Sequence, residues 1–114
     1  MSICLFCKIV QKIIPAKIIF EDKLTIAFED IDPQAPTHLL VIPKKHLESM
    51  ESITSQDKNI LGHVILIARN LAQNQGHTKG GYRLIINTGP DAGQSVFHIH
   101  VHVLAGRKLT WPPG

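Results

Sequence analysis

Residues 96–104 read VFHIHVHVL, and from residue 98 onward polar and apolar residues alternate. Because successive side chains of a β-strand point to opposite faces of its sheet, this run predicts a strand with His98, His100 and His102 on one face. The apolar residues between them would pack on the core. A neutral imidazole needs both a donor and an acceptor partner, so three aligned rings are an unfavourable way to fill a core. The run therefore predicts a strand with one face that carries chemistry.

Two kinds of chemistry use closely spaced histidines. Histidines at i and i+2 of a strand can share a metal ion, and a neutral imidazole can also attack phosphorus to give an adduct that water hydrolyses. The preceding segment favours the second, because the glycines of GPDAGQS at residues 89–95 let backbone N–H groups approach an anion. Neutral donors on Asn87, Gln94 and Ser95 also suit a phosphate group. Phosphate chemistry is therefore predicted at this strand.

The rest of the chain predicts an α+β fold with a five-stranded antiparallel sheet. Short strands bounded by turn-rich segments are expected at residues 17–20, 24–28, 38–42, 82–87 and 96–104. Thr54 and Asp57 form a capping box before one long helix, and Gly76 is its expected end. Apolar residues recur through this helix at Ile60, Leu61, Val64, Ile65, Ala68, Leu71 and Ala72. A short N-terminal helix, capped by Ser2, is expected to end at Pro15.

The length of 114 residues suits a single domain over residues 1–114. The net charge of +3 is spread along the chain, and aromatic residues make up only 5%. A nucleic-acid-binding module would show a basic stripe with stacking aromatics, so no nucleic-acid partner is predicted. The sequence has no apolar run long enough to span a membrane, and its N-terminus lacks the pattern of a signal peptide. A cytoplasmic protein without a membrane partner is expected.

Several segments together resemble the histidine triad superfamily, and within it the Hint branch of nucleotide-binding proteins. They are GQSVFHIHVHVL at residues 93–104, IPAKIIFED at 14–22, PQAPTH at 33–38, VIPKKH at 41–46 and WPPG at 111–114. The resemblance covers nearly the whole chain. It implies a HIT-like fold and a homodimer whose two sheets join into one. It also implies hydrolysis of purine nucleoside 5′-phosphoramidates, such as adenosine 5′-monophosphoramidate, with no metal needed for the chemistry.

The resemblance assigns catalytic roles to four histidines and a serine. His100 would be the nucleophile that attacks the α-phosphorus and forms a nucleotidyl-histidine intermediate. The backbone of His98 would orient the ring of His100, and His102 would contact the phosphate. His38 would belong to the same hydrogen-bonded network, and Ser95 matches a polar residue at the phosphate and the leaving group.

The resemblance also assigns contacts to the nucleotide. Asp30 matches a carboxylate that holds the ribose hydroxyls, which suits a group able to accept from both hydroxyls of a cis-diol. Asn87 matches a polar residue at the phosphate, and Gly93 and Gln94 match the loop beside it. Trp111 matches a tail residue that reaches the partner subunit's site. The residues that match the apolar purine slot are Leu5, Phe6, Ile9, Phe28 and Ile31.

Some of these residues also have an ordinary structural interpretation. Helical spacing alone would place the first three slot residues in the core. Asp30 precedes a proline-containing loop and could be a turn residue, and Trp111 could be a surface aromatic or a dimer contact. His63 and His77 fall outside the matched segments and are expected on the surface of the long helix and in a loop.

Cys4 and Cys7 are separated by two residues and could supply half of a tetrahedral zinc site. Some bacterial members of the family that this chain resembles complete such a site with histidines that correspond to His46 and His98. The predicted metal would be structural, with all four positions filled by protein. The alternative is that the cysteines are two small apolar residues of the first helix. A redox role is disfavoured, because thioredoxin-like cysteines follow the strand of a βαβ unit.

Four functions remain in competition. The complete set of histidines favours a purine nucleoside phosphoramidate hydrolase, since binding alone needs no nucleophile. A nucleotide-binding regulatory or scaffold protein is the second. A dinucleoside polyphosphate hydrolase, similar to the Fhit branch, is the third, and the WPPG tail and Ser95 argue against it. The fourth is a zinc-dependent enzyme that uses the histidines as ligands.

Overall fold

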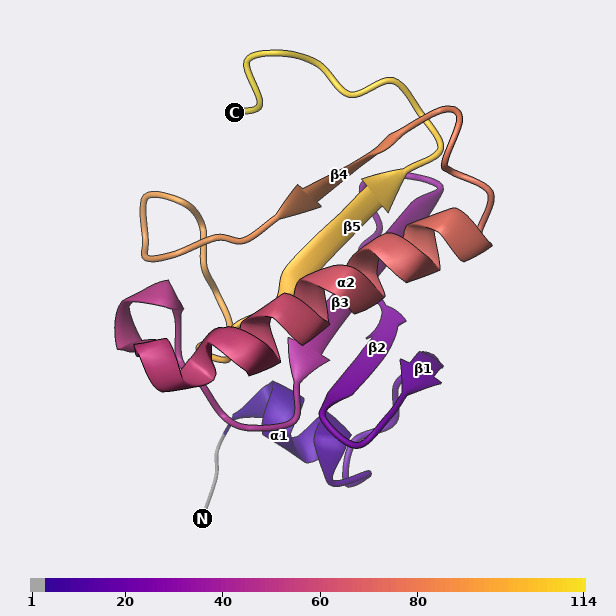
Figure 1. The fold of residues 1–114 in the computed structure, drawn as a ribbon. Helices are drawn as coiled ribbons and strands as arrows, with labels where there is room; N and C mark the ends of the chain where they lie inside the picture. Colours follow the sequence, from indigo (N-terminus) through magenta and orange to yellow (C-terminus); the bar gives the residue numbers. More distant parts are fainter. Residues whose placement is uncertain (1–3) are drawn as a thin grey trace.

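A five-stranded antiparallel sheet is the centre of the fold in the computed structural model, which describes residues 4–114 (Figure 1). Its strands are β1 Ile18–Glu21, β2 Thr25–Glu29, β3 Thr37–Pro43, β4 Tyr82–Ile85 and β5 Val101–Ala105. They lie in the order β1-β2-β3-β5-β4, and each neighbouring pair is antiparallel. The predicted fold class is confirmed. The continuation of the sheet into a homodimer stays a prediction, since one chain is described.

The two α-helices lie on opposite faces of this sheet. The long helix α2, Lys58–Asn74, covers the face seen in front in Figure 1, and the short helix α1, Leu5–Val10, packs on the other. Alternation along the strands separates two cores. The strand residues that pack under α2 are Ala27, Leu39, Val41, Val101 and Val103. Those that pack with α1 are Ile26, Phe28, Leu40 and Ile42.

Local signals set the ends of both helices. At α1 the N-cap is Cys4, whose Sγ accepts the N–H of Cys7 at 3.4 Å, and the predicted cap Ser2 lies outside the described residues. Two short 3-10 helices, η1 Met50–Ser52 and η2 Ser55–Asp57, precede α2. The predicted capping box is confirmed at η2, where the side chains of Thr54 and Asp57 each accept a backbone N–H.

Helix α2 buries a narrower face than the sequence pattern predicted. Its buried residues are Val64, Ile67, Ala68, Leu71 and Ala72. Ile65, which was expected in the apolar stripe, is 37% exposed, because it lies about 100° around the helix from Val64. Gly76 follows the helix with a φ of +87°, as a C-terminal stop favours. None of the helices within residues 4–114 is both long enough and apolar enough to span a bilayer.

The prediction of a strand over residues 96–104 was wrong in its first half, because β5 begins only at Val101. Strand β3 pairs with β5 from Thr37 opposite Ala105 to Val41 opposite Val101. The same register would bring Pro43 opposite residue 99, and proline has no N–H to offer a ladder. The N–H of Ile99 instead donates to the carbonyl oxygen of Leu47 at 2.6 Å.

Strand β4 is also shorter than predicted, since it ends at Ile85 rather than at residue 87. The alternation of faces nevertheless continues upstream of β5. Val101 and Val103 belong to the core under α2, whereas the rings of His98 and His100 contact Phe6 of α1. The histidines therefore share the face that the sequence predicted, although His102 is the one that lies within the strand.

Candidate active site and metal site

His100 is buried just before β5, on the α1 side of the sheet. Its Nδ1 lies 2.8 Å from the main-chain oxygen of His98. A carbonyl oxygen only accepts hydrogen bonds, so in the neutral ring Nδ1 carries the proton and Nε2 keeps its lone pair. The ring centroid lies 5.1 Å from that of Phe6 and 4.9 Å from that of His102, both edge to face. One imidazole nitrogen is thus available as a nucleophile at the predicted residue.

His102 takes part in a second chain of hydrogen bonds. The backbone N–H of Gln34 donates to Nδ1 of His38 at 3.0 Å, so a neutral His38 carries its proton on Nε2. That Nε2 lies 2.9 Å from Nδ1 of His102 and 3.3 Å from a carboxylate oxygen of Asp30. When His38 donates to His102, the proton of neutral His102 is on its own Nε2. His102 then offers the donor that a phosphate oxygen requires.

Burial keeps this pair of rings neutral. Burial, followed by the effects of neighbouring His100 and His38, lowers the pKa of His102 to about 4. Burial also lowers the pKa of His38, against the opposing charges of Asp30 and Asp32. Both rings are therefore uncharged near neutral pH, which preserves the order of donors and acceptors from Gln34 to His102.

The loop before β5 is braced from inside by the buried side chain of Gln94. Its amide oxygen accepts the N–H of Gly89 at 3.0 Å. Its amide nitrogen donates to the carbonyl oxygens of Glu48 and Val96 at 2.8 and 3.2 Å. These bonds use both amide hydrogens, so the side chain of Gln94 shapes the loop rather than offering a donor to a ligand. This differs from the donor role to a phosphate that the residue type predicted.

The other predicted phosphate contacts, Asn87, Gly93 and Ser95, lie in different surroundings. Gly93 is exposed and has a φ of +85°, a conformation that favours glycine. Asn87 is half-buried and lines a pocket together with His38 and His102. Ser95 is exposed and lines a different pocket, on the side of α1. The structure therefore brings Asn87 to the His38–His102 pair and leaves Ser95 beside the first helix.

The residues predicted for the purine slot divide into two groups. Phe6, Ile9 and Phe28 are buried within the core under α1, and the rings of Phe6 and Phe28 lie 5.4 Å apart. Leu5 is 43% exposed and Ile31 is 99% exposed. The ordinary interpretation as core therefore holds for the buried three. A purine slot would have to form between this core surface and the two exposed side chains.

Asp30 and Trp111 both lie near the His38–His102 pair. One oxygen of Asp30 accepts the N–H of Asp32 at 2.8 Å, as in a turn, and the other faces His38. Trp111 is 82% exposed and lines the pocket that contains His38 and His102. Its contact with a partner subunit stays a prediction. Arg83 lines the same pocket and donates to the carbonyl oxygen of Thr110 at 3.0 Å, a role that no sequence motif indicated.

Cys4, Cys7, His46 and His98, here called the quartet, converge on one point where α1 meets the loop after β3. Their ligand atoms all lie within 4.8 Å of one another. Nδ1 of His98 lies 3.6 Å from Sγ of Cys4 and 3.5 Å from Sγ of Cys7. Nδ1 of His46 lies 3.2 Å from both Nδ1 of His98 and Sγ of Cys7. Ligands around a tetrahedral zinc ion are separated by roughly 3.3–3.8 Å, so the quartet fits zinc.

His98 is prepared as a ligand by its other ring nitrogen. Its Nε2 lies 2.7 Å from the carbonyl oxygen of Pro43, so Nε2 carries the proton and Nδ1 keeps the lone pair that faces the cysteines. Burial lowers the pKa of this ring, which favours the neutral form that binds metals. Burial also raises the pKa of the Cys4 thiol, and a bound cation would favour its thiolate. The neutral ligand tautomer is thus built into the fold.

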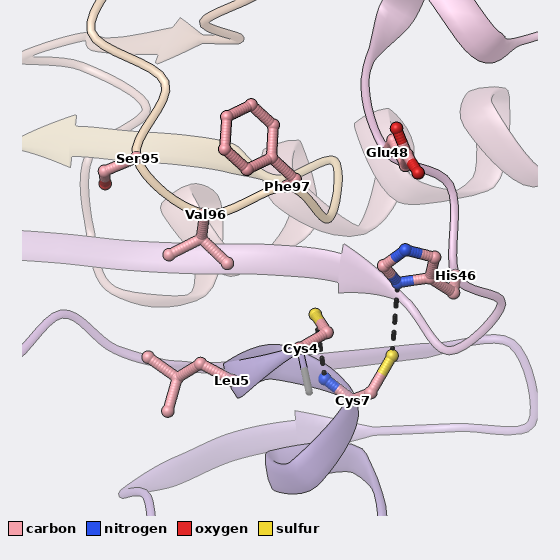
Figure 2. A pocket seen from close by; sticks show the side chains of 8 residues that line it. All are labelled: Cys4, Leu5, Cys7, His46, Glu48, Ser95, Val96 and Phe97. Atoms are coloured by element: carbon pink, nitrogen blue, oxygen red, sulfur yellow. Dashed lines mark hydrogen bonds between the residues drawn. The ribbon is translucent and has the colours of Figure 1, made fainter. Parts of the chain in front are cut away.

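A pocket opens directly beside the quartet (Figure 2). In Figure 2 the side chain of Cys7, from α1, and that of His46, from the loop after β3, point toward each other. Leu5, Val96 and Phe97 give the pocket an apolar wall, and Glu48 and Ser95 add polar groups. His46 is exposed, so solvent reaches the quartet from this side.

We expect the free energy of unfolding to fall as the pH is lowered from about 6.5 toward 4. The unfolded chain binds protons on histidine below a pKa of about 6.5, whereas folded His102 binds one only near pH 4, so acid favours the unfolded state in this window. His102→Gln should reduce this loss by about 1 kcal/mol, which allows for solvent around the ring. Urea denaturation of chelator-treated protein at two pH values measures it, and equal losses in wild type and variant would contradict it.

The remaining two histidines have structural partners away from the site. His63, on α2, lies 2.6 Å from a carboxylate oxygen of Asp22 in the turn between β1 and β2. His77, in the loop after α2, lies 2.8 Å from the hydroxyl of Thr37. Their predicted places on the helix and in the loop are confirmed, and both are half-buried rather than fully exposed.

Comparison with known proteins agrees with this architecture. The family model of the HIT domain matches residues 11–109. An uncharacterised HIT-like protein of Synechococcus elongatus is 48% identical over 110 residues, which are 96% of each chain. A HIT family hydrolase of Legionella pneumophila superimposes with a TM-score of 0.96 at 52% identity, over 97% of this chain and 99% of that one. A histidine triad nucleotide-binding protein of Candida albicans does so with a TM-score of 0.82 at 30% identity, over 96% and 82% of the two chains.

The family match covers most of the residues of the candidate active site. The HIT domain model spans the sheet, helix α2 and all the histidines of the candidate active site. The curated relative and the solved structures extend the likeness to almost the full chain, including α1. The chain belongs to the HIT domain family.

Proposed function

We propose that this protein hydrolyses the P–N bond of purine nucleoside 5′-phosphoramidates through a nucleotidyl-histidine intermediate on His100. The observation that carries the proposal is the bond from Nδ1 of His100 to the carbonyl of His98, which leaves the lone pair on Nε2. A neutral imidazole with that nitrogen available is a nucleophile at neutral pH. The likeness to the HIT family hydrolase of Legionella pneumophila supports hydrolysis, and the likeness to the nucleotide-binding protein of Candida albicans supports a nucleotide substrate.

The proposed reaction has two displacements at the same phosphorus. In the first, Nε2 of His100 bonds to the α-phosphorus and the P–N bond to the amine breaks, and the amine leaves with a proton taken from solvent, which the attacking water gives back in the second step. In the second, water attacks phosphorus, the bond to His100 breaks, and the nucleoside monophosphate is released. Nε2–H of His102 and the side chain of Asn87 would donate to the phosphate oxygens as charge builds on them.

A substrate panel and a trapped intermediate test this proposal. We expect turnover of an adenosine 5′-phosphoramidate with a fluorescent amine to exceed that of diadenosine polyphosphates. Quenching with denaturant at alkaline pH, where a phosphorus–histidine bond survives, should give protein heavier by one adenylyl group, and peptide mass spectrometry should place that group on His100. Faster cleavage of diadenosine polyphosphates would favour the dinucleoside polyphosphate hydrolase. Binding of adenosine monophosphate without any turnover would favour the regulatory protein.

We also propose that Asp30 holds the hydroxyls of the ribose. Its carboxylate lies at the edge of the His38–His102 pair, with its second oxygen 3.3 Å from His38. Asp30→Ala should weaken binding of adenosine monophosphate by about tenfold, because hydrogen bonds to a charged group contribute about 1.5–3 kcal/mol. Deoxyadenosine monophosphate should lose less affinity, since it lacks one hydroxyl. Calorimetric titration of both nucleotides measures the difference, and equal losses would remove Asp30 from the ribose site.

We propose, in addition, a structural zinc ion in the quartet. The separations of 3.2–3.6 Å among its ligand atoms and the fixed tautomer of His98 support it. When bound, zinc would join α1 to the loop after β3 and to the segment before β5. Because Nε2 of His100 is not a member of the quartet, the nucleophile would stay free of the metal.

We propose that the protein works as a homodimer with a shared sheet. The order β1-β2-β3-β5-β4 leaves β1 and β4 as edge strands, each with one row of backbone groups available for a partner strand. Trp111, on the tail beside β4, is exposed enough to contact a second subunit. Sedimentation equilibrium tests the assembly, and a monomer at micromolar concentration would contradict it.

A further inference from the structure

We propose that the quartet and Phe6 together hold the His100 ring in its attacking orientation, so that Phe6 is a positioning residue and the state of the quartet is transmitted to the nucleophile. The inference rests on the function proposed above and gives the quartet an influence on the rate of that reaction. Three sets of contacts carry it, and each joins a member of the quartet, or a residue beside one, to His100 or to the segment that leads into it.

The first link is His98, which uses three of its groups at once. Its Nδ1 faces the sulfur atoms of the quartet, its Nε2–H donates to the carbonyl of Pro43 at 2.7 Å, and its own carbonyl accepts Nδ1–H of His100 at 2.8 Å. The residue is completely buried. A movement of its ring would therefore move the carbonyl that fixes the tautomer and the direction of the His100 ring.

The second link is Phe6, which stands between the two cysteines of the quartet on α1. Its ring lies edge to face with His100, at 5.1 Å between centroids and 88° between planes, and with His98 at 6.1 Å. It is 5% exposed, so the contact is a packed one. Helix α1 has six residues, too few to be stable without tertiary support. Fixing both cysteines fixes the turn that presents Phe6.

The third link is the chain that follows His46. The carbonyl of Leu47 accepts the N–H of Ile99 at 2.6 Å, and the carbonyl of Glu48 accepts the side chain of Gln94 at 2.8 Å. These bonds fix the position of residues 94–99, which form no strand pairs. Anchoring His46 therefore anchors the backbone that ends at His100.

The hydrogen bonds of the His38–His102 pair depend on other residues, although the His102 ring also packs 4.9 Å from that of His100. The pair is held by the N–H of Gln34 and by Asp30, neither of which belongs to the quartet. A change in the quartet should therefore disturb His100 and spare the pair. This selectivity distinguishes a positioning role from a general loosening of the fold.

The first experiment follows the imidazoles by nuclear magnetic resonance in protein labelled with ¹⁵N-histidine. Removing zinc with a chelator should increase the exchange of Nδ1–H of His100 with water by about tenfold or more, with little change in the hydrogen bond between His38 and His102. Circular dichroism checks that the stripped protein stays folded. A folded, stripped protein with an unchanged His100 would overturn the link through the quartet.

The second experiment uses zinc-loaded protein and does not depend on the stripped form being folded. Phe6→Leu should lower kcat for the adenosine phosphoramidate by about tenfold, because small errors in the placement of a reacting group reduce rates strongly. KM should change little. Val10→Ala, which truncates α1 against the same core without touching His100, should leave kcat unchanged. Rescue of kcat in Phe6→Tyr would support the need for a ring.

The outcomes separate this inference from the proposed function. If Phe6→Leu raises KM and leaves kcat intact, Phe6 belongs to a purine slot and the positioning role is wrong. If kcat falls equally in Val10→Ala, the effect is one of stability. If wild type hydrolyses no phosphoramidate, the proposed function fails, and the exchange of His100 Nδ1–H in Phe6→Leu still tests the positioning. A protein that never binds zinc overturns the part that concerns the quartet.

Discussion

Replacing His100 by alanine is expected to lower kcat for a purine nucleoside 5′-phosphoramidate by at least about 10⁴-fold, as loss of a nucleophile does in other enzymes. The variant loses the lone pair on Nε2, and neither His102 nor His38 can replace it. Nδ1 of His102 already accepts from His38, which leaves a donor rather than a nucleophile on its free edge. Fixed-time assays with a fluorescent amine leaving group measure the loss of kcat.

Adenosine monophosphate should still bind to His100→Ala, since Asn87, His102 and Asp30 are untouched. A matched control is His63→Gln, which alters a histidine of α2 bonded to Asp22 in the turn between β1 and β2 and should keep the wild-type rate. A rate in His100→Ala close to that of wild type would refute the assigned role. Loss of nucleotide binding together with turnover would show that His100 also supports the pocket.

Removal of zinc is expected to lower the melting temperature by about 10 °C or more. A ligand present at about 1,000 times its Kd contributes about 4 kcal/mol to the folded state, and about 1 kcal/mol corresponds to roughly 4–8 °C in a domain of this size. The effect should be large here because the quartet joins α1, the loop after β3 and the segment before β5. Calorimetry of zinc-loaded and chelated protein, with elemental analysis for one zinc per chain, measures it.

Cys7→Ser should reproduce the melting temperature of the chelated protein and gain nothing from added zinc. Lys8→Ala is the matched control, because Lys8 neighbours Cys7 on α1 and offers no ligand to the quartet; it should keep both the zinc and the melting temperature. Equal melting of chelated and untreated wild type, with no zinc in the purified protein, would contradict the structural zinc.

The faces of the strands and of α2 could be predicted because local periodicity determines them. The alternation in residues 98–104 placed the histidines on the other face of the sheet from Val101 and Val103. The capping box at Thr54 predicted a helix start just before α2. The start of β5 could not be predicted in this way. It depends on Pro43, which is 58 positions from Val101 in the sequence and meets this segment only in the folded sheet.

The candidate site divides in the same manner. The residue types of the triad and of the C-x-x-C pair are visible in the sequence, so the roles proposed for them could be stated before the structure. The tautomers could not, because they depend on main-chain partners such as the N–H of Gln34 and the carbonyl of Pro43. The inward direction of the Gln94 side chain has the same origin. An amide side chain in a glycine-rich loop suggests a donor to a ligand. The contacts of Gln94 with Gly89, Glu48 and Val96 instead turn it into the protein.

The absence of an N–H on Pro43 has a consequence for the way this molecule opens. The amide hydrogens of β5 that pair with β3 and β4 are protected by the central ladder and should exchange with deuterium only when the whole domain unfolds. The segment of residues 96–100 lies outside that ladder, and its hydrogens should exchange through smaller, more frequent openings. We therefore expect the solvent and ligands around the nucleophile to exchange while the sheet stays closed.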